Sequence, residues 1–181
     1  TIYVDNDNVL AGKEAADYLF RLGHKRIAYL SGDHSLLFNN DRKSGYLLSL
    51  AEHQVPFCPD LCLETPSVPE ECSQALRELL TRPDRPTAVL VSDDILAMSL
   101  EKACMELGLS LPEDLSIISF NNSLFARLTY PPLTSVDINS LQLGIEAASQ
   151  MISHIENPDL MATKTIVPHH LVTRESCRPI S

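Results

Sequence analysis

The chain has 181 residues, of which 44% are hydrophobic and 21% charged, a composition typical of a globular protein with one core or two small lobes. No apolar run approaches the roughly 20 residues of a membrane span, and the first residues lack the pattern of a secretory signal, so we expect a cytoplasmic protein with no membrane partner. The formal net charge of −10 indicates that the surface as a whole repels a phosphate backbone.

Short apolar or β-branched runs alternate with longer helical patterns along the chain, which is typical of crossover units around a parallel sheet. We therefore predict an α/β fold with a doubly wound parallel sheet. The predicted strands are Ile2 to Val4, Arg26 to Ser31, Leu61 to Glu64, Ala88 to Ser92, Ser116 to Phe120, Thr134 to Asp137 and Thr165 to Val167. The predicted helices run from Asn8 to Gly23, Asp41 to Gln54, Ser67 onward, Asp94 to Leu107 and Ser140 to Glu156.

Capping and stop residues set the predicted helix boundaries. The first helix begins after the capping side chains of residues 6–8 and ends at Gly23, whose φ is unrestricted. Ser67 to Glu70 forms a capping box with proline at the first helical position. Residues 121–132 form the longest irregular stretch, and loops of that length are usually functional.

The five cysteines have irregular spacing, which matches neither a disulfide framework nor a zinc pattern. We expect free thiols in a reducing compartment. Cys58 and Cys62, with Cys72 nearby, are the nearest approach to a metal site, but no second close ligand pair completes it. The adjacent His169 and His170 would lie on alternate faces of a strand or loop, so we expect no metal.

Polar side chains follow several predicted strands, and the crevice for ligands in an open parallel sheet lies outside the carboxyl ends of its strands. Arg42 offers a forked set of donors, Asp93 offers paired acceptors, and Asn121 offers both. This set suits vicinal hydroxyls, which must find partners when they lose water. The pattern favours a carbohydrate or similar polyol as ligand.

Each of these residues also has a simpler interpretation. Asp93 and Asp94 follow a strand directly, where an aspartate often serves only as a helix N-cap. Arg42 could be the surface ion-pair partner of an acidic residue on its own helix. An aspartate pair at a strand end could also hold magnesium, as in a phosphate-transfer enzyme.

Several enzyme classes do not fit the sequence. The six glycines are too dispersed for a dinucleotide-binding or phosphate-gripping loop. No Gly-x-Ser-x-Gly elbow and no His-Glu-x-x-His helix occurs. We therefore expect a binding domain with no catalytic residues and no cofactor.

In order along the chain, the motifs resemble the effector-binding region of LacI/GalR-type transcription regulators, and among them the maltose-operon repressors. The resemblance covers nearly the whole chain and rests on the ordered combination of motifs, each of which is weak alone. They are Val4-Asp5-Asn6-Asp7-Asn8 with Gly12, Leu22-Gly23-His24, Ile27 to Gly32, Asp41 to Tyr46, Pro86 to Val89 with Asp93, Asp94 and Ala97, Leu111 to Asn121, and Pro132 to Val136.

The resemblance implies that Arg42 donates to sugar hydroxyls, that Asp93 stands where relatives often carry Asn, and that Asn121 stands where many carry Asp. Ser67 and Ser140 fall where relatives place aromatic rings that line the pocket. The residue that would stack on the sugar ring is then unassigned. Phe38 is our candidate, and the alternative is that Phe38 makes a plain core contact.

The resemblance also implies a periplasmic-binding-protein-like arrangement, mostly the C-terminal lobe. Residues 1–137 would form that lobe, residues 138–164 would return to the N-terminal lobe, and residues 165–181 would form a crossing strand and tail. The N-terminal headpiece, through which relatives contact operator DNA, would be missing. A homodimer would form through the helix Asp94 to Leu107 and the loop Ser123 to Tyr130, with Met98 and Phe125 as candidate anchors and core burial as the alternative for Met98.

The hypothesis is thus a sugar-sensing and dimerisation domain of a repressor, whose ligand controls DNA binding allosterically. A sugar-binding protein of a transport system is the alternative, but the cysteines and the stretch Pro131 to Ser135 favour the regulator. A small phosphate-transfer enzyme is the third reading.

Overall fold

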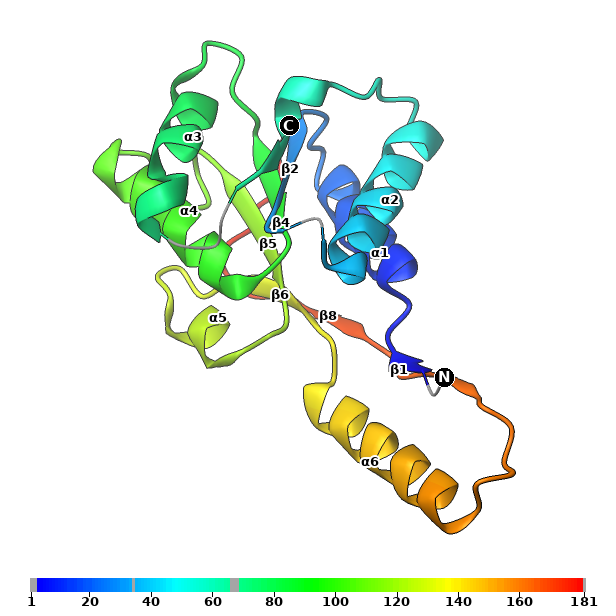
Figure 1. Ribbon diagram of the computed structural model, residues 1–181. Helices are drawn as coiled ribbons and strands as arrows, with labels where there is room; N and C mark the ends of the chain where they lie inside the picture. Colours follow the sequence, from blue (N-terminus) through cyan, green and yellow to red (C-terminus); the bar gives the residue numbers. More distant parts are fainter. Residues whose placement is uncertain (1–2, 34, 66–68, 181) are drawn as a thin grey trace.

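The computed structural model describes residues 3–33, 35–65 and 69–180, and there the chain builds one large sheet with helices on both faces and an arm at one end (Figure 1). The sheet order is β3 (Cys62–Glu64), β2 (Ile27–Ser31), β4 (Ala88–Val91), β5 (Ser116–Phe120), β6 (Thr134–Asp137) and β8 (His170–Val172). Neighbouring strands are parallel except for β6 and β8. The predicted doubly wound α/β fold is confirmed.

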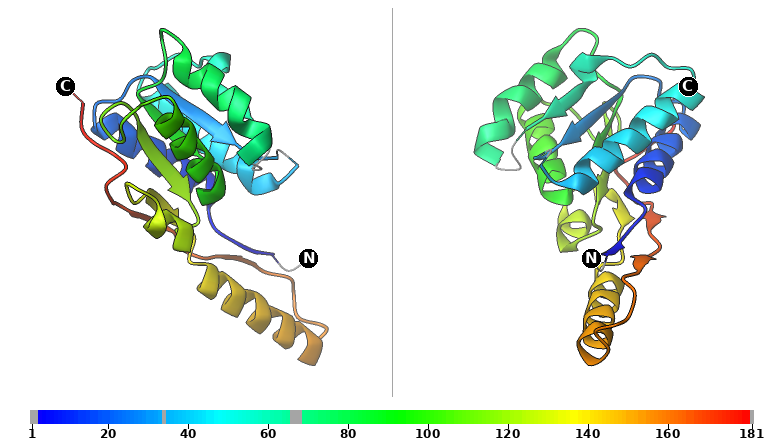
Figure 2. Two further views of the ribbon diagram at one scale, coloured as in Figure 1. Left: turned by 90° about the vertical axis from the view of Figure 1, so that its left-hand side faces the viewer. Right: turned by 45° about the vertical axis from the view of Figure 1, so that its right-hand side comes forward.

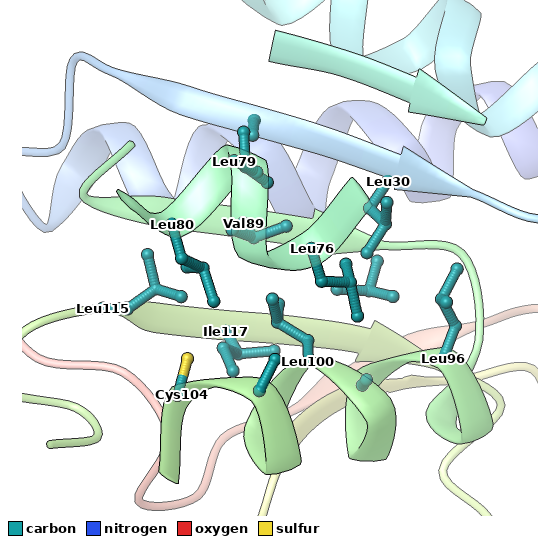
Figure 3. Close-up of a cluster of buried hydrophobic side chains, with 14 of the residues drawn as sticks. Leu30, Leu76, Leu79, Leu80, Val89, Leu96, Leu100, Cys104, Leu115 and Ile117 are labelled. Atoms are coloured by element: carbon teal, nitrogen blue, oxygen red, sulfur yellow. The ribbon is translucent and has the colours of Figure 1, made fainter. Parts of the chain in front are cut away.

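Two layers of helices sandwich this sheet. Helices α1 (Asn8–Arg21) and α2 (Leu37–Glu52) cover one face, and α3 (Pro69–Thr81) and α4 (Asp94–Glu106) cover the other. Alternate residues of β2 serve the two faces, because Tyr29 packs with α1 and α2 while Leu30 joins the leucine-rich cluster under α3 and α4 (Figure 3). Burial of both faces explains why the strands read as continuous apolar runs.

Helices α1 and α2 pack backbone against backbone at two glycines. A Cβ atom at Gly12 would overlap the carbonyl group of Arg42, and a Cβ atom at Gly45 would overlap the carbonyl oxygen of Val9. Only hydrogen fits at either position. This close contact fixes the first turns of α2 against α1.

The arm projects from the carboxyl end of the sheet in every view (Figures 1 and 2). It consists of a parallel pair, β1 (Tyr3–Asp5) and β7 (Lys164–Ile166), and the helix α6 (Ser140–Glu156). Helix α6 has no buried residue, and Leu141 and Ile155 are 76% and 72% exposed. The arm therefore carries an apolar helix face that the described part of the chain leaves uncovered.

Several predicted boundaries differ from the structure. Strands β1 and β7 were expected in the main sheet but pair with each other in the arm. Strand β8 was not predicted, and it lies in the segment expected to form a crossing strand and tail. A short helix, α5 (Leu124–Leu128), lies in the stretch predicted to be irregular. Helix α2 begins at Leu37 rather than Asp41; its N-cap residue is Leu36, which makes no side-chain capping hydrogen bond and so gives no start signal in the sequence.

The cysteines are free thiols, as predicted. Among residues 3–33, 35–65 and 69–180, no three His, Cys, Asp or Glu side chains gather as a metal site. Over the same ranges, no helix has the length and apolar content needed to cross a membrane. The predicted capping box at Ser67 lies outside the described residues.

The turn after α1 is held by the C-terminal tail. Gly23 has a φ of +94°, and the backbone of Ile180 donates to the carbonyl of Leu22 at 2.8 Å. The adjacent His24 is buried, and its Nε2 lies 3.2 Å from the carbonyl of Arg178, so Nε2 donates and Nδ1 accepts the Thr87 hydroxyl proton at 3.0 Å. The neutral ring therefore joins the tail to the sheet.

Acid should weaken this junction. Burial lowers the pKa of His24 below its usual 6.5, so the unfolded chain takes up the proton first as the pH falls. The contribution of His24 to stability is complete above about pH 6.5 and declines as the pH falls through the window between the unfolded and folded pKa values. We expect the free energy of unfolding, measured in urea from pH 8 to pH 5, to fall with a slope that His24→Gln reduces. His170→Gln replaces an exposed histidine and should keep the wild-type slope; equal slopes for all three proteins would refute the assignment.

Candidate ligand-binding site

The buried guanidinium of Arg42 lies where the chain changes direction at the carboxyl edge of the sheet. After β2 the chain crosses to α2 on one face, and after β4 it crosses to α4 on the other, so the two connections diverge at the edge where open parallel sheets bind ligands. Arg42 is 3% exposed; its Nη1 donates to the carbonyl of Ser92 at 2.7 Å and its Nε donates to Oδ1 of Asn8 at 3.0 Å. Two anchors thus fix the plane of the guanidinium.

Two aromatic rings also contact this guanidinium. Its Cζ atom lies 4.3 Å from the ring centre of Phe120 and 4.8 Å from that of Phe38. Burial lowers the pKa of Arg42 to about 10, and nearby carboxylates, including those of Asp5 and Asp93, offset part of that shift. Arg42 therefore stays cationic at neutral pH, and its charge is shielded from bulk water.

The neighbouring carboxylates Asp93 and Asp94 have different environments. Asp93 is half-buried and caps α4, because its Oδ1 accepts from the backbone of Leu96 at 2.8 Å. Asp94 is 2% exposed; its Oδ1 accepts from the hydroxyls of Ser119 and Ser135 at 2.5 and 2.9 Å. Its Oδ2 accepts from the backbone N–H of residue 123 at 2.7 Å. Asp94 is therefore a structural residue that ties β5, β6 and the following loop together.

Asparagines form the turn after β5. Asn121 and Asn122 have φ values of 94° and 47°, a conformation that asparagine tolerates better than most residues. Asn121 is half-buried, and its backbone N–H donates to the carbonyl of Val136. Asn122 donates to Asp137 and accepts from Arg174 at 2.8 and 2.5 Å. Asn122 is thus held within the lobe, whereas Asn121 stands at the sheet edge.

The structure brings Arg42, Asp93 and Asn121 to the same edge. Arg42 binds the carbonyl of Ser92, next to Asp93, and lies on the ring of Phe120, next to Asn121, which places the three residues near one another at the carboxyl edge of the sheet. Burial of Arg42 contradicts the alternative of a surface ion pair, whereas the N-cap interpretation of Asp93 is correct.

The other predicted site residues have different surroundings. Phe38 is half-buried against Arg42, which is neither a plain core contact nor an open platform. Ser140 is exposed at the start of α6, and no hydrogen bond within the described ranges joins it to Arg42, Asp93 or Asn121. Ser67 lies outside the described residues.

Sequence reasoning missed two groups that hold Arg42. Asn8 was assigned only a capping role, and Phe120 was assigned only to a strand. The position of Phe120 directly before Asn121 is a signal that could have found it, since the last residue of a parallel strand borders the crevice. The carbonyl of Ser92 carries no signal in the sequence.

A second surface lies on α4 and α5, away from this edge. Large apolar side chains are exposed there, among them Met98 at 37%, Phe125 at 46%, Met105 at 74% and Tyr130 at 94%. Met98, Met105 and Tyr130 border a hollow of about 910 Å³. The alternative of core burial for Met98 is therefore wrong, and the patch is of the kind that marks protein contacts.

Comparison with known proteins identifies the domain family of this chain. The model of the periplasmic binding protein-like domain matches residues 16–177. The chain is similar to the probable HTH-type transcriptional repressor ExuR of Bacillus subtilis, with 30% identity over 93% of the chain and 51% of the relative. It is similar to the HTH-type transcriptional regulator DegA of the same organism, with 33% identity over 97% of the chain and 52% of the relative. The chain thus spans about half the length of the curated relatives it matches.

Solved structures agree with this class. A LacI transcriptional regulator of Bacillus cereus subsp. cytotoxis superposes with a TM-score of 0.95 and 37% identity, over 99% of this chain and 64% of that one. The regulator CelR in complex with cellobiose gives 0.91 and 27%, over 97% and 54%. A LacI family regulator of Enterococcus faecium with bound ribose gives 0.91 and 27%, over 100% and 67%.

Proposed function

Because the chain belongs to the periplasmic binding protein-like domain family, as an effector-binding region of the LacI/GalR type, we propose that it is the sugar-sensing part of a transcriptional repressor. The observation that carries the proposal is the buried guanidinium of Arg42, anchored on two sides at the divergence of β2 and β4 beside Asp93 and Asn121. A fixed donor with neighbouring acceptors can pair with hydroxyls that are both donors and acceptors.

The ligand we propose is a sugar. Two related regulators have been solved with a bound sugar, cellobiose in one and ribose in the other, which supports a sugar as the class of ligand. The motifs of this chain make a maltose-type sugar the first candidate. Arg42 and Asn121 would bind hydroxyls, and Phe38 would border the sugar ring. Ser67 and Ser140 would line the rest of the pocket, where their small size leaves space for a larger ligand.

The apolar face of α6 supports a second lobe. Residues 1–137, apart from β1 in the arm, would form one lobe, residues 138–164 would belong mainly to the other, and residues 165–181 would cross back from β7 and end in the tail. A sugar held between the lobes would favour one closure angle, to the extent that its affinities for the open and closed states differ. The change in closure would alter operator binding through the headpiece of the full-length protein. A cytoplasmic location goes with that role.

Titration tests the proposed pocket. We expect one sugar from a panel of maltose-type, glucose-type and ribose-type compounds to bind the full-length protein. Asp93→Ala should weaken its binding roughly 30-fold, the value of one hydrogen bond to a charged group. Calorimetry gives both affinities. Asp84→Ala, at the opposite end of the sheet where Asp84 pairs with Arg26, should bind as the wild type does. Absence of binding by every sugar would contradict the proposal.

Two copies would associate through the patch on α4 and α5. The exposed Met98 and Phe125 would be its anchors, since a charge introduced there would be buried on association. We expect sedimentation equilibrium to show a wild-type dimer and a Met98→Glu monomer. Leu48→Glu changes a residue of α2 that is 50% exposed on the other face, and it should remain a dimer. A dimeric Met98→Glu variant would place the contact elsewhere.

Two rival functions fit less well. The relatives ExuR and DegA and the LacI structure of Bacillus cereus are transcriptional regulators, which favours regulation over transport and over enzymatic activity. The pair Asp93 and Asp94 is unsuited to hold magnesium between its carboxylates, because both oxygens of Asp94 accept hydrogen bonds from the protein.

A further inference from the structure

Three segments connect the lobe to the arm, and all three meet at the side chain of Asn6. The segments lie between β1 and α1, between β6 and α6, and between β7 and β8. Asn6 belongs to the first, and its Nδ2 donates to the carbonyl of Ile138 in the second at 3.0 Å and to the carbonyl of Val167 in the third at 2.8 Å. Both protons of one carboxamide are thus used, each on a different segment.

This junction is protected from water. Asn6 is 5% exposed and Val167 is 2% exposed, so the hydrogen bond between them does not compete with solvent, and the bond to Ile138 is partly buried. The backbone N–H of Val167 also donates to the carbonyl of Asp5 at 2.8 Å, which adds a direct link between the first and third segments. Within the part of the chain that the structure describes, no backbone hydrogen bond links the second segment to the first, and the Asn6 side chain supplies that connection.

A continuous set of hydrogen bonds runs from this junction to Arg42. The Oδ1 atom of Asp5 accepts from the backbone of Asn6 at 2.8 Å and from Nδ2 of Asn8 at 3.1 Å. The Oδ1 atom of Asn8 in turn accepts from Nε of Arg42 at 3.0 Å. The side chain that we assign to the sugar is therefore positioned by the same short segment that carries Asn6.

We propose that Asn6 is the pivot of this protein, a positioning residue that holds the three connections at one point and makes the arm turn as a unit when a ligand engages Arg42. The inference rests on the proposed function for the ligand, but the clamp itself is independent of it. Without the carboxamide the second connection loses its link to the first, the third keeps only its backbone bond to Asp5, and closure over the ligand no longer sets the position of the arm. Two sites are coupled when both bias the same two-state element. Here that element would be the arm, and the clamp would be the axis about which the arm turns relative to the lobe.

Hydrogen exchange tests the clamp in the full-length protein without ligand. In Asn6→Ala we expect the amides of Asn139 and Val167, each in a connection other than that of Asn6, to lose at least tenfold of their protection together. Asn6→Ser, whose hydroxyl can donate to one carbonyl only, should give a smaller loss at one of the two sites and covers the case in which the alanine variant folds poorly. Unchanged protection at both amides in the folded variants overturns the proposal.

A second measurement separates a pivot from a merely structural residue. Operator affinity with and without the bound sugar gives a coupling ratio, which should fall at least fivefold toward one in Asn6→Ala while sugar affinity changes less than threefold. The matched control Ser176→Ala removes a buried hydroxyl that donates to Ile117 and accepts from Thr134 at the far side of the lobe, so it should lower stability and keep the ratio. A wild-type ratio for Asn6→Ala overturns the pivot. If wild-type protein itself shows no sugar-dependent operator binding, the proposed function fails, and the exchange measurement still decides the clamp.

Discussion

Arg42→Lys is expected to weaken sugar binding by roughly 30-fold, equivalent to about 2 kcal/mol for one lost hydrogen bond to a charged group. The guanidinium uses Nε and Nη1 to bind Asn8 and Ser92, and its planar fork presents the remaining donors in a fixed direction. An ammonium group is a point charge on a flexible stem. It can satisfy one of these anchors or reach the ligand, but it cannot keep the same geometry for both.

Calorimetric titration with the best ligand measures this loss, and circular dichroism establishes that the variant is folded. Lysine keeps the positive charge between the two aromatic rings, so the comparison isolates hydrogen-bond geometry from charge. Arg26→Lys provides the control, because Arg26 pairs with Asp84 at the amino end of the sheet. Equal affinities of wild type and Arg42→Lys would remove Arg42 from the pocket.

Gly45→Ala is expected to destabilise the chain by about 3 kcal/mol, the upper part of the usual range for overpacking. The added methyl group would overlap the carbonyl oxygen of Val9, and that atom belongs to the backbone of α1 and cannot rotate away as a side chain can. The two helices must move apart, and the cluster around Tyr29 and Tyr46 beneath them opens.

Thermal unfolding followed by circular dichroism should show a midpoint lower by about 6–12 °C. Gly144→Ala is the matched control, since Gly144 is also within a helix but a Cβ atom there would contact nothing within 4 Å. Alanine has the higher helix propensity, so this control should be neutral or more stable by up to about 1 kcal/mol. A midpoint of Gly45→Ala close to that of the wild type would show that α1 and α2 separate at little cost.

The sheet was predictable because its strands are buried on both faces. Continuous apolar runs such as Ile27–Ser31 and Ser116–Phe120 identify central parallel strands without any tertiary information. The arm was not predictable in the same way. Strands β1 and β7 have three residues each, and nothing in so short a pattern tells whether they join the main sheet or pair with each other.

The sequence predicted at which edge of the sheet the candidate site lies, but it did not predict the role of each residue there. Parallel strands bring their carboxyl ends together, which is why Arg42, Asp93 and Asn121 meet. The sequence could not separate Asp93 from Asp94, because the two adjacent residues differ only in which one points toward Ser119 and Ser135. That direction depends on the packing of α4 against β5 and β6.

The two outermost strands of the main sheet, β3 and β8, are each three residues long. A short edge offers few unpaired backbone groups, so it is a poor template for a strand from another molecule. Growth of the sheet from molecule to molecule, the usual route to fibrous aggregates, is thereby limited at both margins. Association through the edges of the main sheet is therefore disfavoured, whereas the exposed side chains on α4 and α5 remain available for it.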